Sequence, residues 1–160
     1  MFGSTYEREA AFTDDMWYGR LANPQATTFI TLQADCVVGT LTVVGPLPFR
    51  PDESPPATYP KNSLAGEEPR YWHSRIDGIF TAPEVRGRGV AKALIEKGIK
   101  FGLDEAAKSD KEYVASIVVD SDNAAAKGLY EKYGYVTIKE EPRSPGSART
   151  VLLMEYSLNP

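Results

Sequence analysis

A glycine-rich turn between a predicted strand and a predicted helix constrains this chain more than any other feature of its sequence. The turn is Arg86-Gly87-Arg88-Gly89. Residues 71–81 are rich in aromatic and branched side chains and predict a strand before it, while apolar periodicity over 90–103 predicts an amphipathic helix after it. Glycines let a backbone approach a ligand closely, and N–H groups at a helix N-terminus attract anions. The turn therefore favours a phosphate or pyrophosphate site, with tight strand–helix packing as the alternative.

The remaining sequence predicts a mixed α/β domain. Capping residues and apolar periodicity predict one helix over 4–21, capped by Ser4, and another over 123–133, capped by Ser121 and Asp122. Runs of branched and aromatic residues predict further strands over 27–33, 36–44, 113–119, 135–139 and 150–156. Because helices and strands intermix within 160 residues, we expect one domain spanning residues 1–160.

A proline-rich segment interrupts this pattern. Residues 45–69 contain seven prolines and many polar side chains. Proline removes a backbone donor and fixes φ, so no regular element is expected there. A loop of this length inside a compact domain is often functional, and a disordered surface insertion is the alternative.

Charge and the scarcity of metal-binding side chains exclude several classes of function. The net charge of −4 argues against general nucleic-acid binding, which needs a surplus of Lys and Arg. Cys36 is the single cysteine and His73 the single histidine, which excludes a thiolate zinc site and most histidine metal sites. No apolar stretch reaches the roughly 18 residues that span a bilayer, and no signal-like segment follows Met1. We expect a cytoplasmic protein without a metal.

Two segments resemble motifs of the Gcn5-related N-acetyltransferase (GNAT) superfamily. Residues 86–91 (RGRGVA) match that family's acyl-CoA signature, Arg/Gln-x-x-Gly-x-Gly/Ala, at every fixed position. Residues 123–135 (NAAAKGLYEKYGY) resemble its second motif, in which an Asn opens a helix and a Tyr follows. The two motifs occur in the family's order, separated by one predicted helix and one predicted strand. The resemblance runs from about Ser4 to Tyr156.

The resemblance implies a fold and an activity. The fold would be GNAT-like: a mixed, mostly antiparallel sheet flanked by helices, splayed between the strands at 71–81 and 113–119. The strand and helix that usually open the family's core are expected to be missing, since only three residues precede Ser4. The activity would be direct transfer of an acetyl group from acetyl-CoA to a primary amine of a small molecule or peptide.

The resemblance also assigns residues to CoA. The diphosphate would lie on backbone N–H groups of the signature segment, the pantetheine arm along the preceding strand, and the CoA arm against the Asn and Tyr of the second motif. The expected CoA-binding residues are Ile79, Phe80, Thr81, Arg86, Gly87, Arg88, Gly89, Val90, Ala91, Asn123 and Tyr130.

Tyr130 is the expected general acid. It matches the position where the family keeps a proton donor, and a phenol with a pKa near 10 can protonate a departing thiolate. The alternative is core packing, because Tyr130 also belongs to an apolar helical stripe with Ala126, Leu129 and Tyr133.

A general base is also expected, because an alkylammonium group is unreactive until it loses a proton. By the resemblance, His73 falls where one branch of the family places a Glu and another a His as the general base, and its ordinary pKa near 6.5 suits the role. Asp77 or a water chain is the next choice, and Asp77 could instead orient the substrate ammonium. A strand histidine that is satisfied in the core is the alternative for His73.

Two further functions compete with catalysis. The chain could be a non-catalytic acyl-CoA-binding or regulatory module of the same fold, or a protein-interaction domain whose glycine turn is structural. Phe29, Ile30 and Leu32 place large apolar groups on a strand whose outer edge has no evident partner. We therefore expect a dimer through strand pairing or segment exchange, unless residues upstream of Met1 exist in the natural protein.

Overall fold

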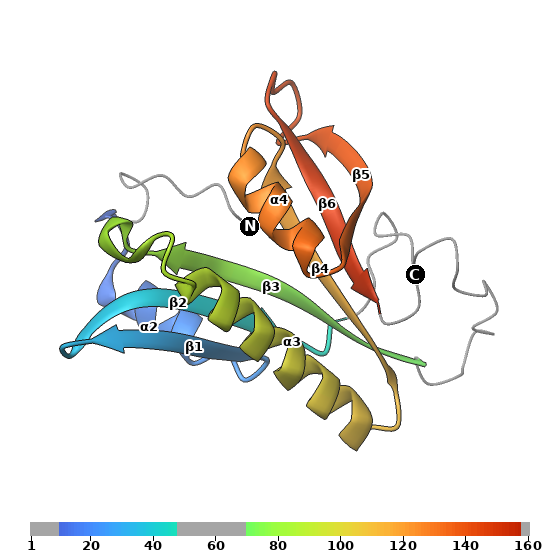
Figure 1. Cartoon of the computed structure of the whole chain (residues 1–160), viewed down its shortest axis with the longest axis horizontal. Helices are drawn as coiled ribbons and strands as arrows, with labels where there is room; N and C mark the ends of the chain where they lie inside the picture. Colours follow the sequence, from blue (N-terminus) through green and yellow to red (C-terminus); the bar gives the residue numbers. More distant parts are fainter. Residues whose placement is uncertain (1–9, 48–69, 158–160) are drawn as a thin grey trace.

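The computed structural model describes residues 10–47 and 70–157, which form one sheet with helices on both faces (Figure 1). The sheet has six strands in the order β1-β2-β3-β4-β6-β5 within these residues. The strands are β1 (Ala26–Gln33), β2 (Cys36–Val44), β3 (Tyr71–Thr81), β4 (Glu112–Asp120), β5 (Tyr135–Pro142) and β6 (Thr150–Ser157). The helices are α2 (Asp14–Leu21), α3 (Val90–Lys108) and α4 (Ala124–Lys132), with a 3-10 turn, η1 (Pro83–Val85), after β3.

The sheet splits between its two parallel strands. β3 and β4 run parallel, and all other neighbouring strands pair antiparallel. β3 and β4 pair only from Tyr71 opposite Glu112 to Arg75 opposite Ser116. Beyond Arg75 and Ser116, here called the divergence point, β3 stays with β2 while β4 stays with β6 (Figure 1). The predicted mixed, mostly antiparallel sheet with its splay is therefore confirmed.

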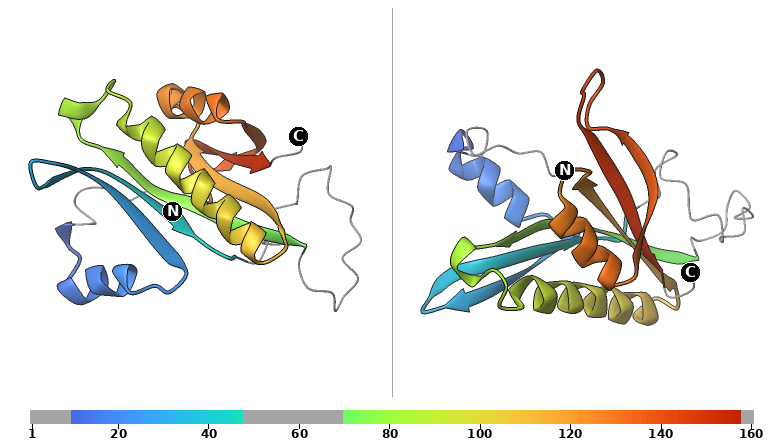
Figure 2. Two further views of the ribbon diagram at one scale, coloured as in Figure 1. Left: turned by 60° about the horizontal axis from the view of Figure 1, so that its bottom comes forward. Right: turned by 45° about the horizontal axis from the view of Figure 1, so that its top comes forward.

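Two helices cover the same face of this sheet. α3 and α4 lie on one side, and α2 lies on the other side from α3 (Figure 2). α3 comes close to β2 and β4 because it carries glycines at its contact points: a Cβ on Gly98 would lie 2.9 Å from Leu41, and one on Gly102 would lie 2.2 Å from the Tyr113 ring. Between helices and sheet lies a core that includes Leu41, Ile95 and Met154, each at most 1% exposed.

The first predicted helix is wrong in its extent. Residues 11–13 are not helical, and α2 begins only at Asp14 because Thr13 is extended and its side chain accepts a hydrogen bond from the Met16 N–H, at 3.4 Å. No residue of α2 is buried. The expected Ser4 cap lies outside the described residues.

The cap of α4 also differs from the prediction. Asn123, rather than Ser121 or Asp122, caps this helix by accepting a hydrogen bond from the Ala126 N–H, at 3.1 Å. The Ser121 hydroxyl instead lies 2.6 Å from that of Thr150 at the start of β6, and the Asp122 carboxylate pairs with Arg149, which precedes that strand, at 3.2 Å. The sequence pattern could not distinguish three adjacent residues that all make good caps.

The remaining expectations concern the loop and the edge strand. Residues 48–69 of the predicted proline-rich loop lie outside the described part of the chain. In the part that is described, β1 pairs only with β2, and Ile30 and Leu32 are more than half exposed. Among the described helices, none is both long and apolar enough to cross a bilayer.

Candidate functional site

The glycine turn is open at its surface. Gly87 and Gly89 have φ values of +75° and +83°, a left-handed conformation that favours glycine. A Cβ placed on either would meet no heavy atom within 4 Å. The turn conformation therefore accounts for these two glycines, and the open space above them leaves room for a ligand to approach the backbone.

The turn also presents free backbone donors. Gly89 is the N-cap of α3 and supplies no side-chain cap. The helical ladder starts with the Ala93 N–H on the Gly89 carbonyl, at 3.0 Å, so the N–H groups of Val90, Ala91 and Lys92 point out of the helix end without an intrahelical partner. A 19-residue helix adds its dipole to this end, which makes the turn a suitable site for a diphosphate.

The two arginines of the turn differ in position. Arg86 donates from Nε to the Thr81 carbonyl at 3.2 Å and so ties the turn to the end of β3. Arg88 is exposed, and its charge remains close to the helix N-terminus. Both raise the positive potential where an anion would bind.

The end of β3 offers a free backbone edge next to the turn. Phe80 and Thr81 pair with Thr40 and Gly39 of β2 on one side. On the other side, β4 has already separated at the divergence point, so no described strand pairs with residues 76–81 there. A linear ligand with amide groups, such as a pantetheine arm, could hydrogen-bond along this edge. The structure thus brings Ile79 to Thr81 beside residues 86–91, and the binding of CoA by these residues stays a prediction.

Tyr130 lies on α4 with a buried ring and an unengaged hydroxyl. The side chain is 7% exposed, and its ring packs at 5.9 Å from that of Tyr135. Burial raises the pKa of Tyr130 to about 12. Its hydroxyl forms no hydrogen bond within the described residues. The ring of Tyr130 is therefore part of the core, and the role of its hydroxyl as a proton donor stays a prediction.

Asn123 is held at the start of the same helix. Its side-chain oxygen accepts a hydrogen bond from the Ala126 N–H, and the residue is exposed. The cap fixes the direction of the side chain and leaves its NH₂ group as a donor. Whether that donor contacts CoA stays a prediction.

His73 is placed in the interior of the sheet. It is 2% exposed, and its Nε2 lies 2.9 Å from the Ser116 Oγ of β4. Burial lowers the pKa of His73 to about 4, against an opposing hydrogen bond with the Leu47 backbone. A neutral imidazole can accept a proton, but one with so low a pKa is a weak base. The role of His73 as base stays a prediction that this environment disfavours.

Asp77 lies beyond the divergence point on the same face of β3 as His73. It pairs in register with Thr42 of β2 and precedes Gly78, which has a φ of +62°. Asp77 is half-buried. It is therefore nearer than His73 to the separated ends of the strands.

Sequence reasoning missed Glu155, a buried carboxyl on β6. It is 4% exposed, burial raises its pKa to about 8, and its Oε1 has no hydrogen-bond partner within the described residues. The available signal was a lone acidic residue in the apolar run Val151–Tyr156, a strand buried on both faces.

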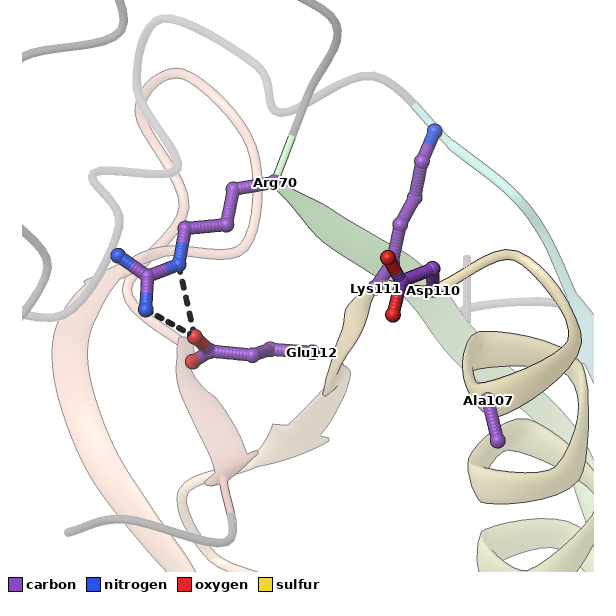
Figure 3. Close-up of a pocket in the computed structure, with 5 residues that line it drawn as sticks. All are labelled: Arg70, Ala107, Asp110, Lys111 and Glu112. Atoms are coloured by element: carbon purple, nitrogen blue, oxygen red, sulfur yellow. Dashed lines mark hydrogen bonds and ion pairs between the residues drawn. The ribbon is translucent and has the colours of Figure 1, made fainter.

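A separate hollow lies at the far end of α3. Its volume is about 450 Å³, and Arg70, Ala107, Asp110, Lys111 and Glu112 line it (Figure 3). Arg70 donates from Nε to Glu112 at 2.7 Å along one side. The length of α3, about 28 Å at 1.5 Å per residue, separates this hollow from the glycine turn, so the two are distinct features.

Metal-binding side chains do not cluster in the described residues. Neither 10–47 nor 70–157 contains a group of three or more His, Cys, Asp or Glu side chains that could hold an ion.

Known proteins share this fold and part of this sequence. The N-terminal acetyltransferase B complex catalytic subunit NAA20 of Arabidopsis thaliana is 32% identical over 65 residues, which span 41% of this chain and 35% of that protein. The chain thus covers about a third of the length of this curated relative. The crystal structure of the Escherichia coli ribosomal-protein-S18-alanine N-acetyltransferase has a TM-score of 0.60 at 18% identity, covering 92% of this chain and 79% of that one.

A second solved structure adds a ligand-bound example of the fold. Arabidopsis thaliana Naa50, in complex with the bisubstrate analogue CoA-Ac-MVNAL, has a TM-score of 0.62 at 14% identity, covering 91% of this chain and 82% of that one. The model of the acetyltransferase (GNAT) family matches residues 2–135, which include both motifs and the divergence point. This chain therefore belongs to the acetyltransferase (GNAT) family.

Proposed function

We propose that the chain is an acetyl-CoA-dependent N-acetyltransferase that moves an acetyl group directly to a primary amine of a small molecule or peptide. The observation that carries the proposal is the open turn at Gly87 and Gly89, next to the free edge of β3. Together they offer a diphosphate site and a pantetheine site that are continuous. Membership in the GNAT family supports the same reaction class.

The relatives indicate which acceptors to test first. The NAA20 relative is named a catalytic subunit of an N-terminal acetyltransferase complex, and the Naa50 structure holds an analogue that joins CoA to a peptide. A peptide with a free N-terminus is therefore our first acceptor class, with small polyamines and aminoglycosides beside it. The net charge of −4 is compatible with cationic acceptors of each kind.

The proposed reaction needs few groups from the protein. The neutral amine attacks the acetyl carbon, the new C–N bond forms and the C–S bond breaks, with its electron pair going to sulfur. The Tyr130 hydroxyl can give its proton to the CoA thiolate. It can then regain a proton from the newly acetylated nitrogen, which is positively charged until it loses one. The N–H groups at the start of α3 hold the donor while this occurs.

A non-catalytic acyl-CoA-binding module is the second candidate. It is favoured by the burial of His73 and its pKa of about 4, which leave this predicted base weak. Such a module would bind CoA through the same turn and would turn over no amine.

Binding and turnover measured together distinguish the two candidates. Calorimetry with acetyl-CoA tests the site, and release of free CoA thiol over a panel of a peptide, spermidine and an aminoglycoside tests transfer. Binding with release that depends on an amine supports the transferase. Binding without any release supports the module, and no binding contradicts both.

A further inference from the structure

Glu155 belongs to one transverse row of residues that crosses the sheet. Strand register places Arg75 of β3 opposite Ser116 of β4, Ser116 opposite Glu155 of β6, and Glu155 opposite Val136 of β5. Residues opposite one another in a sheet lie on the same face, about 5 Å apart from strand to strand. Arg75, Ser116 and Glu155 therefore line up side by side.

This row lies at the divergence point. Arg75 and Ser116 are the last residues through which β3 and β4 pair. The face is the one opposite α3, because the neighbours of Glu155 in sequence, Met154 and Tyr156, pack in the core on the helix side. Glu155 thus sits beside the start of the strand separation, on the face that the CoA helix does not cover.

Among the described residues, the surroundings of Glu155 supply little to balance a negative charge. Ser116 faces it from β4 and is already engaged by the His73 imidazole. Val136 faces it from β5, and further along that strand Lys139 forms an ion pair with Glu141, at 2.8 Å. Arg75 of β3 lies on the far side of Ser116, two strands away from Glu155. Burial is the cause of the raised pKa, and one carboxyl oxygen is buried without a partner.

A buried carboxyl of this kind is suited to a cation from outside the protein. Burial of a carboxylate is costly unless a cation accompanies it. A primary ammonium group supplies both the charge and N–H donors for the unpartnered oxygen. When the ammonium gives up a proton, the carboxyl returns to the neutral form that its surroundings favour.

Resting on the proposed function, we propose that Glu155 binds the ammonium group of the acceptor amine and removes one of its protons before acetyl transfer. In this step one N–H bond of the ammonium breaks, an O–H bond forms on Glu155, and the nitrogen keeps the electron pair that attacks the acetyl carbon. Glu155 keeps this proton after the acetylated product leaves and releases it to solvent when the next ammonium group binds. His73 and Ser116 position this face of the sheet without titrating in the step.

A kinetic comparison of two matched variants tests the role. Glu155→Gln keeps the shape and removes the basicity, and Glu141→Gln is the control, an acidic residue on the adjacent strand that is already paired with Lys139. We expect kcat/KM for the amine to fall about 10²-fold or more in Glu155→Gln, with acetyl-CoA affinity and Tm retained, and to stay within about threefold in Glu141→Gln. A Glu155→Gln variant with unchanged kcat/KM would overturn the role and leave the proposed function standing.

A readout without turnover separates this inference from the proposed function. Infrared difference spectra of the CoA complex at pH 6.5 should show the carbonyl band of a protonated carboxylic acid that Glu155→Gln lacks. Saturating n-butylamine should remove this band in the wild type, because the ammonium draws Glu155 into its ionised form. Loss of the band without turnover of any amine supports the ammonium site and contradicts the transferase. A band that persists at saturating n-butylamine contradicts the inference, whether or not an amine is acetylated.

Discussion

The Nε2 atom of His73 lies 2.9 Å from the Oγ atom of Ser116, and this contact joins β3 to β4 just before the two strands diverge. Both residues are 2% exposed. A histidine in this position is well placed to hold two strands together and poorly placed to collect protons from an amine, since burial disfavours its charged form. The contact thus predicts a structural role at the divergence point.

The first prediction concerns the pH dependence of catalysis in a His73→Gln variant. With a pKa of about 4, His73 is neutral across pH 5–9, so it cannot cause an acid limb of kcat/KM near neutral pH. We expect His73→Gln, whose amide can still reach Ser116, to keep any limb between about pH 6 and 8. A limb in that range that disappears in this variant would instead identify His73 as the general base.

The second prediction concerns stability against pH. The folded-state pKa of His73 is lowered, so protonation of this residue disfavours the folded state. The free energy of unfolding should therefore decrease by roughly 3 kcal/mol as pH falls from about 6.5 to 4. The folded-state pKa of Glu155 is raised, so ionisation of this residue disfavours the folded state. The free energy of unfolding should therefore decrease by roughly 2–4 kcal/mol as pH rises from about 4.5 to 8. Through these two groups, the free energy of unfolding measured by chemical denaturation should be highest between pH 5 and 6.

The matched variant for the alkaline side is Glu155→Gln. It removes the ionisation, so its stability should fall less than that of the wild type between pH 6 and 9. Parallel curves for the two proteins over this range would mean that Glu155 is already ionised in the fold.

The strands and α3 could be predicted from the sequence, but the site at the divergence point could not. Alternation and apolar periodicity are local, and they located every described strand and the start of α3 at Val90. The row of Arg75, Ser116 and Glu155 depends on the register of three strands from distant parts of the chain. The register between distant strands cannot be deduced from a local sequence pattern. For this reason the sequence indicated only that Glu155 belongs to an ordinary buried strand.

The third prediction separates the hydroxyl of Tyr130 from its ring. Tyr130→Phe keeps the packing against Tyr135 and removes a hydroxyl that has no partner in the described structure. We expect near-native Tm and CoA affinity, with kcat lower by about 10²-fold. Tyr135→Phe is the control: its hydroxyl is also unpartnered, but it is fully buried, so kcat should not change. Equal kcat values for both variants and the wild type would assign Tyr130 to the core alone.

The fourth prediction concerns the glycine turn. Gly89→Val adds a side chain where the backbone has φ +83°, which strains the turn by roughly 1–3 kcal/mol and fills the open surface above it. Coenzyme A at 100 times its Kd should stabilise the wild type by about 2.7 kcal/mol, and we expect this shift to vanish in the variant. Gly19→Ala in α2, another glycine with open space around it, should keep the full shift. If coenzyme A still stabilises Gly89→Val by the same amount, the assignment of the diphosphate to this turn is contradicted.

The last prediction concerns the outer edge of β1. Within the described residues this strand pairs only with β2, while Ile30 and Leu32 are 53% and 56% exposed. Unpaired N–H and C=O groups beside exposed apolar side chains favour pairing with another chain, and a symmetric dimer is the commonest closed arrangement. Light scattering at micromolar concentration should give twice the 17.6 kDa of one chain. Leu32→Lys should return the protein to a monomer, because a charge on this edge opposes strand pairing, whereas Thr137→Lys on β5, at the opposite edge of the sheet, should leave the mass unchanged. A monomeric wild type whose β1 amides exchange freely with solvent would show that this edge is open in solution.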